Sequence, residues 1–328
     1  MRYMVGAYAA APPLTGGQGS LEQEFYARLR DERFVAGLEL PFWQALHPQD
    51  EKRYVAGLSP AWDFALTLLP GTMEALAAGR TYGLASVDED GRQAALRTVR
   101  RALDAVKQLN DHCGRAAVGT VELHSAPRQG PGGGTGSVAA LTQSLRELRA
   151  WDWQGAVLAL EHCDAFVPGQ APAKGFLALP QELQAIRDSD PAPTPLGMTL
   201  NWGRSALEGR NATLPLEHVR SMRAAGRLRG IIFSGCTASH PLWGAWQDTH
   251  APFGPAFGLP FTVPESLLTA QAARECLAAA PVDELALLGF KIKPLPDSLP
   301  VSERVDWLRG TAAVLDRCVE AAASRAGA

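Results

Sequence analysis

Short runs of the chain alternate apolar side chains with small, polar or charged ones. In the run that ends at Lys293, one face carries Leu288, Phe290 and Ile292, and the opposite face carries Lys291 and Lys293. Alternation with a period of two residues predicts a β-strand that has one face against an apolar layer. The run therefore predicts a strand that ends with ionisable amines on its other face.

Three other runs show the same alternation and also end in polar residues. The run 118–124 ends with Glu122 and His124 on one face, another run ends with Glu161, and a third ends with Asn201. Strands with polar inward ends, separated by helical stretches, are typical of a (β/α)-barrel enzyme, because the active site is built at the carboxyl ends of the strands. We expect a carboxylate, an imidazole, an amide and an amine to meet there.

Eight segments have strand-like patterns, and segments with helical periodicity lie between them. Ser137 is a candidate N-cap for one helix, whose apolar stripe includes Leu141, Leu145 and Leu148. The repeated strand-then-helix order favours a parallel sheet, and eight strands can close a barrel. We predict an α/β fold in which residues 1–328 form a single (β/α)8 TIM barrel. The predicted strands are residues 3–8, 35–40, 64–69, 118–124, 157–161, 196–201, 228–234 and 285–293.

Proline and glycine clusters interrupt this order, mostly after predicted strands, where the catalytic loops of a barrel lie. They occur at residues 11–19, 128–136, 168–175 and 252–264. The segment 238–264 is too long for an ordinary connection. We expect extended loops after the strands and interpret residues 238–264 as a lid.

Composition limits the classes of partner. The 328 residues are 46% hydrophobic and 20% charged, enough for one barrel with its core. The net charge of -3, with mixed signs along the chain, gives no basic surface for nucleic acid. No apolar stretch is long enough to cross a bilayer, and five widely spaced cysteines predict reduced thiols. We expect a cytoplasmic protein with a small-molecule partner, and the oligomeric state stays open.

Eight short motifs, in this order, resemble an uncharacterised bacterial family grouped with the xylose isomerase-like barrels. The resemblance covers nearly the whole chain and implies a TIM barrel without an established reaction. The motifs are GLELP at 37–41, WD at 62–63, LPGTM at 69–73, HSAP at 124–127, EHCD at 161–164, NWGR at 201–204, FSGC at 233–236 and DTH at 248–250.

The wider xylose isomerase-like group usually holds a divalent metal with carboxylates and imidazoles from its later strands. Only Glu161 matches that pattern well, since Asn201, Ser234 and Lys291 stand where the resemblance implies an aspartate, a histidine and a glutamate. An ammonium at Lys291 adds positive charge where a cation would have to bind. We therefore expect no resident metal. If one binds, the candidate ligands are Glu161, Glu122, His124, Asp248 and His250.

Lys291 has three interpretations that the sequence leaves open. It can be an ion-pair partner for the Glu161, Glu122 and Glu39 carboxylates, or a fixed charge that polarises a substrate oxygen. It can also lose its proton and attack a carbonyl, which is Schiff-base chemistry. Lys293 lies one pleat further out and is expected to be solvated.

Several residues are candidates for substrate binding, each beside a structural alternative. Arg204 can clamp an anionic group or pair with Glu208 four residues later. Trp202, Trp243 and Trp246 can form a platform for a sugar ring or only pack loops. The other candidates are Glu39, Asn201, Ser234, Asp248 and His250.

Residues on the opposite faces of the predicted strands have structural interpretations. His162 and Asp164 alternate away from Glu161, and we expect them to fix the loop that follows. Asp63 stands at the start of its strand and is expected at the barrel floor.

The leading functional hypothesis is a sugar isomerase or epimerase that moves a proton next to a carbonyl. Glu161 or Glu122 would be its base, His124 its acid or orienting group, and Lys291 would polarise the oxygen. An aldolase or lyase that works through an imine on Lys291 is the second hypothesis. A barrel that binds carbohydrate without catalysis is the third.

Overall fold

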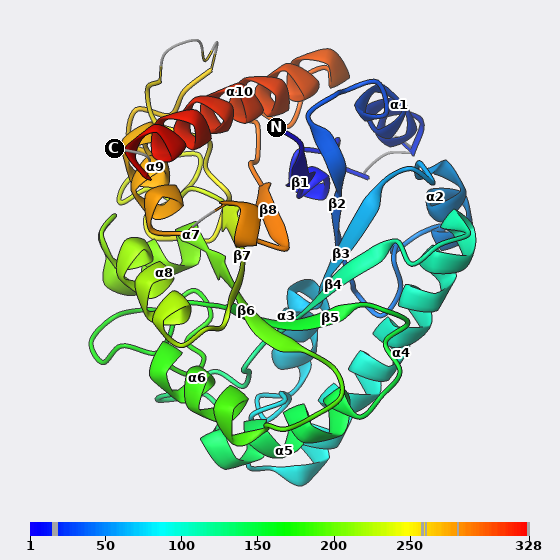
Figure 1. Cartoon of the computed structure of the whole chain (residues 1–328), viewed down its shortest axis with the longest axis vertical. Helices are drawn as coiled ribbons and strands as arrows, with labels where there is room; N and C mark the ends of the chain where they lie inside the picture. Colours follow the sequence, from blue (N-terminus) through cyan, green and yellow to red (C-terminus); the bar gives the residue numbers. More distant parts are fainter. Residues whose placement is uncertain (15–18, 257–258, 260, 281, 327–328) are drawn as a thin grey trace.

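The computed structural model describes residues 1–14, 19–256, 259, 261–280 and 282–326. Eight parallel strands pair in chain order and close into a barrel, as predicted (Figure 1). Each strand pairs with its neighbours in sequence, and β1 pairs with β8. The strands are β1 (Tyr3–Val5), β2 (Val35–Pro41), β3 (Asp63–Thr67), β4 (Val118–Leu123), β5 (Val157–His162), β6 (Leu196–Asn201), β7 (Leu228–Phe233) and β8 (Leu287–Phe290).

Helices surround the barrel, and the carboxyl-terminal helix α10 lies between α1 and α9 (Figure 1). Ser137 caps α5 as predicted, because its hydroxyl accepts a hydrogen bond from the backbone N–H of Ala140 at 3.1 Å. The helices are α1 (Gly19–Leu29), α2 (Glu51–Gly57), α3 (Leu69–Ala78), α4 (Glu89–Cys113), α5 (Val138–Arg149), α6 (Leu179–Asp188), α7 (Trp202–Gly209), α8 (Leu214–Ala224), α9 (Ala270–Ala279) and α10 (Val301–Ala326), with 3-10 turns η1 (Ala7–Ala9) and η2 (Val282–Glu284).

Five predicted strands extend beyond the observed ones, and three of them do so by two residues or more. The prediction for residues 3–8 is wrong beyond Val5, because the chain turns into η1. The prediction for 64–69 is wrong at its end, because α3 begins at Leu69 with Pro70 in its first turn. In the run 285–293, β8 covers only Leu287–Phe290, although the N–H of Lys291 still donates to the Phe233 carbonyl at 2.9 Å.

The barrel interior is apolar at one level and polar beyond it. Met4, Ala65, Ile232 and Leu287 form an apolar cluster from four strands. The larger core lies between the sheet and the helices, and buries side chains such as Leu38 completely. Burying one leucine side chain contributes about 1.5–3 kcal/mol. This packing fixes the strands, so the polar residues at their carboxyl ends have defined positions.

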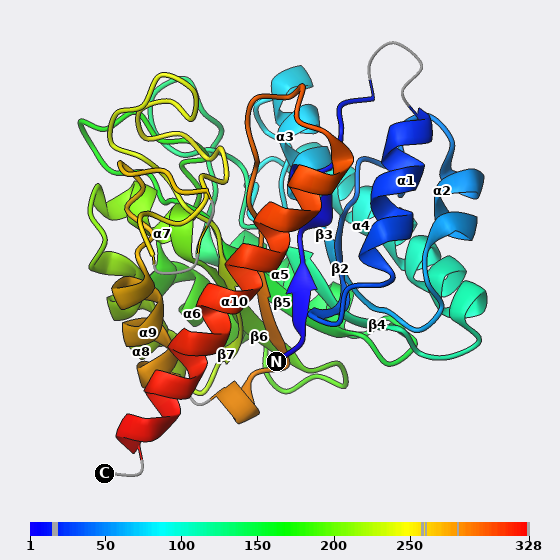
Figure 2. The same cartoon turned by 90° about the horizontal axis from the view of Figure 1, so that it is seen from above.

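The loop after β7 contains the predicted lid, residues 238–264, of which 257, 258 and 260 lie outside the described residues. Isolated bridges join Gly235 to Ala251 and Thr237 to Ser266. Trp246 and His250 have positive φ values of 54° and 56°. Figure 2 shows this loop, in yellow, on the side towards which the β1 arrow points.

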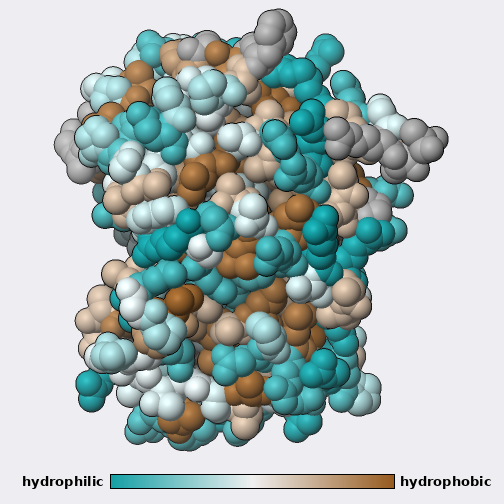
Figure 3. All heavy atoms as spheres, turned by 90° about the vertical axis from the view of Figure 1, so that its left-hand side faces the viewer, coloured by the Kyte–Doolittle hydropathy of each residue, from teal (hydrophilic) through white to brown (hydrophobic). Residues whose placement is uncertain are grey.

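All five cysteines are free thiols. Among the described residues, none of the helices is both long and apolar enough to cross a membrane. On the face drawn in Figure 3, hydrophilic and hydrophobic residues are interspersed.

Candidate active site

Polar side chains from the carboxyl ends of the strands converge inside the barrel and are almost completely buried. Alternation along each strand turns these side chains inward. One carboxylate oxygen from each of Glu39, Glu122 and Glu161 lies within 4.8 Å of the other two. The structure brings together Glu39, Glu122, His124, Glu161, Asn201, Arg204, Ser234, Asp248, His250 and Lys291 through the contacts described below.

Glu161 is the most highly connected carboxylate of this network. Its Oε1 lies 2.5 Å from a guanidinium nitrogen of Arg204 and accepts from Asn201 Nδ2 at 3.0 Å. Its Oε2 lies 2.9 Å from His124 Nε2 and accepts from the Thr67 hydroxyl at 3.3 Å. Burial alone would raise the pKa of Glu161, but Arg204 and Lys291 outweigh it and hold the pKa well below its usual range. Glu161 is therefore an ionised anchor.

The Lys291 ammonium is buried between carboxylates. Its Nζ lies 2.6 Å from Glu39 Oε1 and 3.8 Å from Glu161 Oε1, and donates to the Tyr8 hydroxyl at 3.3 Å. Burial alone would lower the pKa of Lys291, but Glu39 in particular raises it well above its usual range. Lys291 is therefore a fixed positive charge, which disfavours its use as a neutral amine nucleophile.

Glu122 has the opposite protonation state. Neither of its carboxyl oxygens has a hydrogen-bond partner among the described residues, and the side chain is fully buried. Burial, reinforced by the nearby Glu161 and Glu39 carboxylates, raises the pKa of Glu122 well above its usual range. The raised pKa favours a neutral carboxylic acid, which can donate a proton, and the role of Glu122 as a base stays a prediction.

His124 is a neutral imidazole held by Glu161. Burial lowers its pKa, although the hydrogen bond with Glu161 acts in the opposite direction. A neutral ring that donates from Nε2 to Glu161 carries its lone pair on Nδ1. That atom has no hydrogen-bond partner among the described residues. Nδ1 is therefore free to accept a proton.

A second layer of charge surrounds Asp248. Its Oδ2 lies 3.0 Å from Arg204 Nε and 3.0 Å from Lys174 Nζ, and its Oδ1 lies 3.5 Å from His250 Nδ1. Ser234 Oγ lies 2.8 Å from the same His250 nitrogen. Burial would raise the pKa of Asp248, but Lys174 and Arg204 hold it well below its usual range. Burial lowers the pKa of His250 to about 3.

The structure decides between two pairs of alternatives that the sequence left open. Arg204 pairs with Glu161 and Asp248, so its alternative pairing with Glu208 is not formed. Trp202 is fully buried in the main hydrophobic core, where its indole lies beside the Cys276 thiol of α9. It is therefore not part of a sugar platform, because the first residue of α7 points away from the barrel interior.

The other two tryptophans have separate surroundings. Trp243 donates its indole N–H to the Lys293 carbonyl at 3.1 Å, and Trp246 lies under the Arg210 guanidinium, 5.0 Å from the ring centroid. Trp246 remains a candidate at the rim of the barrel. Lys293 itself is partly exposed, and its Nζ lies 3.7 Å from Asp297 Oδ1.

Two site residues were not identified from the sequence. Tyr8 lies beyond β1 and its hydroxyl contacts Lys291. Lys174 lies in the proline and glycine cluster 168–175, and reaches Asp248. The only sequence signal for Lys174 was its position in a loop that follows a predicted strand. The only signal for Tyr8 was its position at the end of a predicted strand.

The network does not fit an oxygen-ligated divalent metal. Glu39, Glu122 and Glu161 have metal-like spacing, but the Lys291 ammonium lies against two of them. Arg204 adds a second cation to Glu161. Asn201 donates to Glu161 and Ser234 binds His250, so neither position supplies the anionic or imidazole ligand that the resemblance implies.

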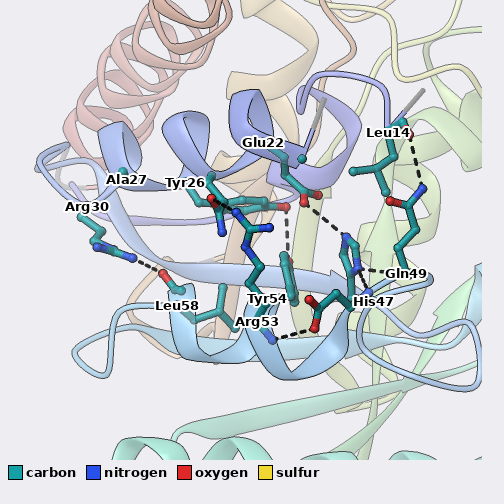
Figure 4. Close-up of a pocket in the computed structure, with 14 residues that line it drawn as sticks. Leu14, Glu22, Tyr26, Ala27, Arg30, His47, Gln49, Arg53, Tyr54 and Leu58 are labelled. Carbon is teal, nitrogen blue, oxygen red and sulfur yellow. Dashed lines mark hydrogen bonds and ion pairs between the residues drawn. The ribbon is translucent and has the colours of Figure 1, made fainter. Parts of the chain in front are cut away.

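Cavities adjoin the network on the side of β1 and β2. A cavity of about 260 Å³ is lined by Tyr8, Pro41, Trp43 and His47, among others. A neighbouring cavity of about 280 Å³ lies between α1 and α2 (Figure 4) and shares His47. Tyr8 therefore separates solvent-accessible space from Lys291.

Comparisons with known proteins agree with this architecture. A family profile described as "Domain of unknown function (DUF4862)" matches residues 4–307. An uncharacterized protein of Salmonella typhimurium is 35% identical over 307 residues, which cover 94% of each chain. Among solved structures, an L-ribulose 3-epimerase matches with a TM-score of 0.55 and 14% identity, covering 99% of this chain and 96% of that one. A xylose isomerase domain protein from Planctomyces limnophilus matches with a TM-score of 0.54 and 14% identity, covering 98% of each chain.

Proposed function

The chain belongs to the DUF4862 family, and we propose that it is a sugar isomerase or epimerase. The reaction would move a proton on a carbon next to a carbonyl group. Its substrate would be a small carbohydrate or a sugar derivative.

One observation carries the proposal: the surroundings of two neighbouring carboxyl groups shift their pKa values in opposite directions. Burial and nearby carboxylates raise the pKa of Glu122, while Arg204 and Lys291 keep Glu161 ionised. Pairs of titratable groups whose pKa values are pushed apart are typical of acid–base catalysis. Buried polar groups that serve only structure are normally hydrogen-bonded, whereas both Glu122 oxygens lack a partner among the described residues.

The residues divide the chemistry as follows. His124 Nδ1 accepts the proton from carbon, and Glu161 stabilises the imidazolium that forms. Lys291 stabilises the negative charge that develops on the carbonyl oxygen. Glu122 donates a proton to complete the transfer, and a proton then passes from the His124 imidazolium to the Glu122 carboxylate, which restores both groups. In this scheme Lys291 and Arg204 supply the positive charge that a metal supplies in other proteins.

Access to the network requires motion, because its side chains are almost completely buried. The segment 238–264 contributes Asp248 and His250, and its non-glycine residues Trp246 and His250 have left-handed backbones. Such local strain is common at functional sites that move. These features support a lid role for this segment, which would open for substrate and then exclude water.

A panel of aldoses and ketoses incubated with the protein in D2O tests the proposal. We expect one sugar to isomerise or epimerise and to gain deuterium at the carbon next to its carbonyl, as measured by NMR. The second candidate, a non-catalytic carbohydrate-binding barrel, is favoured by the closed state of the network. Saturable sugar binding without deuterium exchange would support that candidate and contradict the proposal.

Borohydride treatment with the same sugar tests the imine hypothesis. Because Lys291 is held charged by Glu39, we expect no covalent adduct on Lys291 in the mass spectrum of the protein.

A further inference from the structure

A cluster of two imidazoles and a carboxylate lies on the outer face of the sheet, apart from the proposed active site. His162 ends β5 and points away from the barrel interior, Glu208 lies on α7, and His218 lies on α8. Each offers one ligand atom, and the three atoms lie within 4.8 Å of one another. The proposed reaction uses none of these residues.

The distances between these atoms are close to those around a small metal ion. His162 Nε2 lies 3.0 Å from Glu208 Oε2, and His218 Nε2 lies 3.8 Å from Glu208 Oε1. Zinc bonds to nitrogen and oxygen are about 2.0–2.2 Å long, so tetrahedral ligand atoms are separated by a little over about 3 Å. Binding would therefore need only small shifts of the side chains.

Both imidazole rings are already oriented through their other nitrogen. His162 Nδ1 lies 2.6 Å from Glu182 Oε2, and the other Glu182 oxygen accepts from the Ser125 hydroxyl at 2.5 Å. His218 Nδ1 lies 3.0 Å from the Ser205 hydroxyl. Metal-binding histidines almost always have such a partner, which fixes the ring and directs the Nε2 lone pair to the metal.

His218 brings a second imidazole to this cluster. Its side chain is 9% exposed, and its Nε2 makes no hydrogen bond to the described residues. The ring is packed edge-to-face on His162, with the ring centroids 4.8 Å apart. His218 Nε2 lies 3.8 Å from Glu208 Oε1, which is too distant for a hydrogen bond and leaves space for a cation between the two atoms.

We propose that His162, Glu208 and His218 bind a zinc ion, with water as the fourth ligand. Two imidazoles and one carboxylate are a ligand set that zinc accepts, and a divalent ion would balance the Glu208 and Glu182 carboxylates. Glu208 Oε2 would keep the hydrogen bond that it accepts from the Ala165 N–H at 2.9 Å.

Zinc would replace the proton that now bridges these carboxylates. Burial alone would lower the pKa of His162, but Glu182 and Glu208 raise it to about 10, so the ring is an imidazolium between two anions. The pKa of His218 is lowered to about 3 by burial and by His162, so this ring is already neutral. The metal-bound form thus requires the loss of one proton from His162.

The ion would connect β5 with α7 and α8. His162 directly follows Glu161, whose carboxylate is the anchor of the proposed active site, and α7 carries Arg204. Bound zinc would therefore stabilise the elements that position the Glu161–Arg204 pair without touching the substrate.

The test measures zinc in the purified full-length protein. The protein is stripped with EDTA, dialysed against zinc chloride and then against buffer, and analysed by inductively coupled plasma mass spectrometry. We expect about one zinc per chain in the wild type and in two control variants, and almost none in His218→Gln. The controls are Glu122→Gln, which alters the acidic cluster in the barrel, and His240→Gln, which alters the partly exposed His240–Glu265 pair.

Absence of zinc from the wild type, its retention in His218→Gln or its loss from either control would overturn the proposal. Zinc-free His218→Gln should melt close to the zinc-free wild type, and added zinc should raise the melting temperature of the wild type alone. Cobalt substitution keeps the test decisive if the variant fails to fold. We expect the wild type with Co2+ to show the intense visible absorption of a four-coordinate ion. The weak spectrum of six-coordinate Co2+ would contradict the proposed zinc site.

Discussion

The Nζ atom of Lys291 lies 2.6 Å from Glu39 Oε1, and both side chains are completely buried inside the barrel. An ammonium in this position is stabilised by the carboxylates around it, and it stabilises them in return. The pair explains why the acidic cluster can exist without a metal. It also makes Lys291 the positive charge closest to Glu39.

Replacing Lys291 tests this role. We expect Lys291→Met to abolish turnover and to lower the free energy of unfolding by about 3 kcal/mol, because it leaves buried carboxylates without their cation. Urea unfolding and the sugar assay measure the two effects. Lys293→Met is the matched control, since the Lys293 side chain is partly exposed and outside the buried network, and it should change neither quantity. Similar behaviour of both variants would exclude Lys291 from the site.

Replacing Glu122 separates its chemistry from its packing. Glutamine has the same shape and the same charge as the neutral acid, so we expect Glu122→Gln to fold with at least wild-type stability. Turnover should fall by about 10²–10⁴-fold, because the general acid is lost. Glu161→Gln should instead destabilise the protein strongly, since Arg204 and Lys291 lose their ionised partner. Retained turnover in Glu122→Gln would contradict the assignment of the acid.

The stability of the protein should depend on pH through Glu122 in a predictable direction. Its folded pKa is raised above the ordinary value of 4.5, so the folded state holds a proton that the unfolded state loses. The free energy of unfolding that Glu122 contributes is fully present below pH 4.5, where both states hold the proton, and is lost as pH rises towards the folded pKa. The unfolding free energy of Glu122→Gln, relative to wild type, should therefore increase from about pH 4.5 to 8. Denaturant unfolding at both pH values measures it, and a difference that stays constant would contradict the raised pKa.

Gly6 provides the space that Lys291 occupies. A Cβ at Gly6 would lie 2.6 Å from Lys291 Cβ and 2.7 Å from Glu39 Oε2. We expect Gly6→Ala to destabilise the protein by about 1–3 kcal/mol through overpacking and to reduce turnover. Gly119→Ala in β4 is the control, because a Cβ there meets nothing within 4 Å. Thermal unfolding measures the melting temperatures of both variants. Equal melting temperatures would contradict the prediction.

Turnover should not require a metal. Lys291 and Arg204 already neutralise the carboxylates of the barrel interior, so we expect activity to survive dialysis against EDTA. Any zinc lost from the His162 cluster should change melting temperature more than rate. Activity lost on chelation and restored by Mg2+, Mn2+ or Zn2+ would show that the charge assignment is wrong.

The barrel could be predicted from the sequence because apolar and polar residues alternate along its strands. This alternation arises because one face of each strand packs against the apolar core. The same alternation identified Glu39, Glu122, Glu161 and Lys291, since a strand residue two positions from an inward residue is also inward. Strand ends were less predictable: helix-forming signals such as Pro70 compete with the strand pattern there.

Contacts made by loops could not be predicted from local patterns. The pairing of Arg204 with Asp248 joins residues 44 positions apart, and Lys174 reaches the same carboxylate from another loop. Trp202 was misassigned because it immediately follows an inward residue, and the start of α7 turns it into the outer core. Protonation states depend on the sum of such contacts, so Glu122 could not be distinguished from Glu161 in advance.

The opposite protonation of Glu122 and Glu161 is the claim on which the proposed chemistry depends, and infrared difference spectroscopy tests it most directly. Spectra of wild type and Glu122→Gln would be compared at neutral pH, with Asp164→Asn as a control because burial also raises the pKa of that carboxyl. We predict a neutral carboxylic acid C=O band in the wild type that is absent from Glu122→Gln and that remains in Asp164→Asn. A wild-type spectrum with only carboxylate bands, or an acid band that survives in Glu122→Gln, would contradict the assignment.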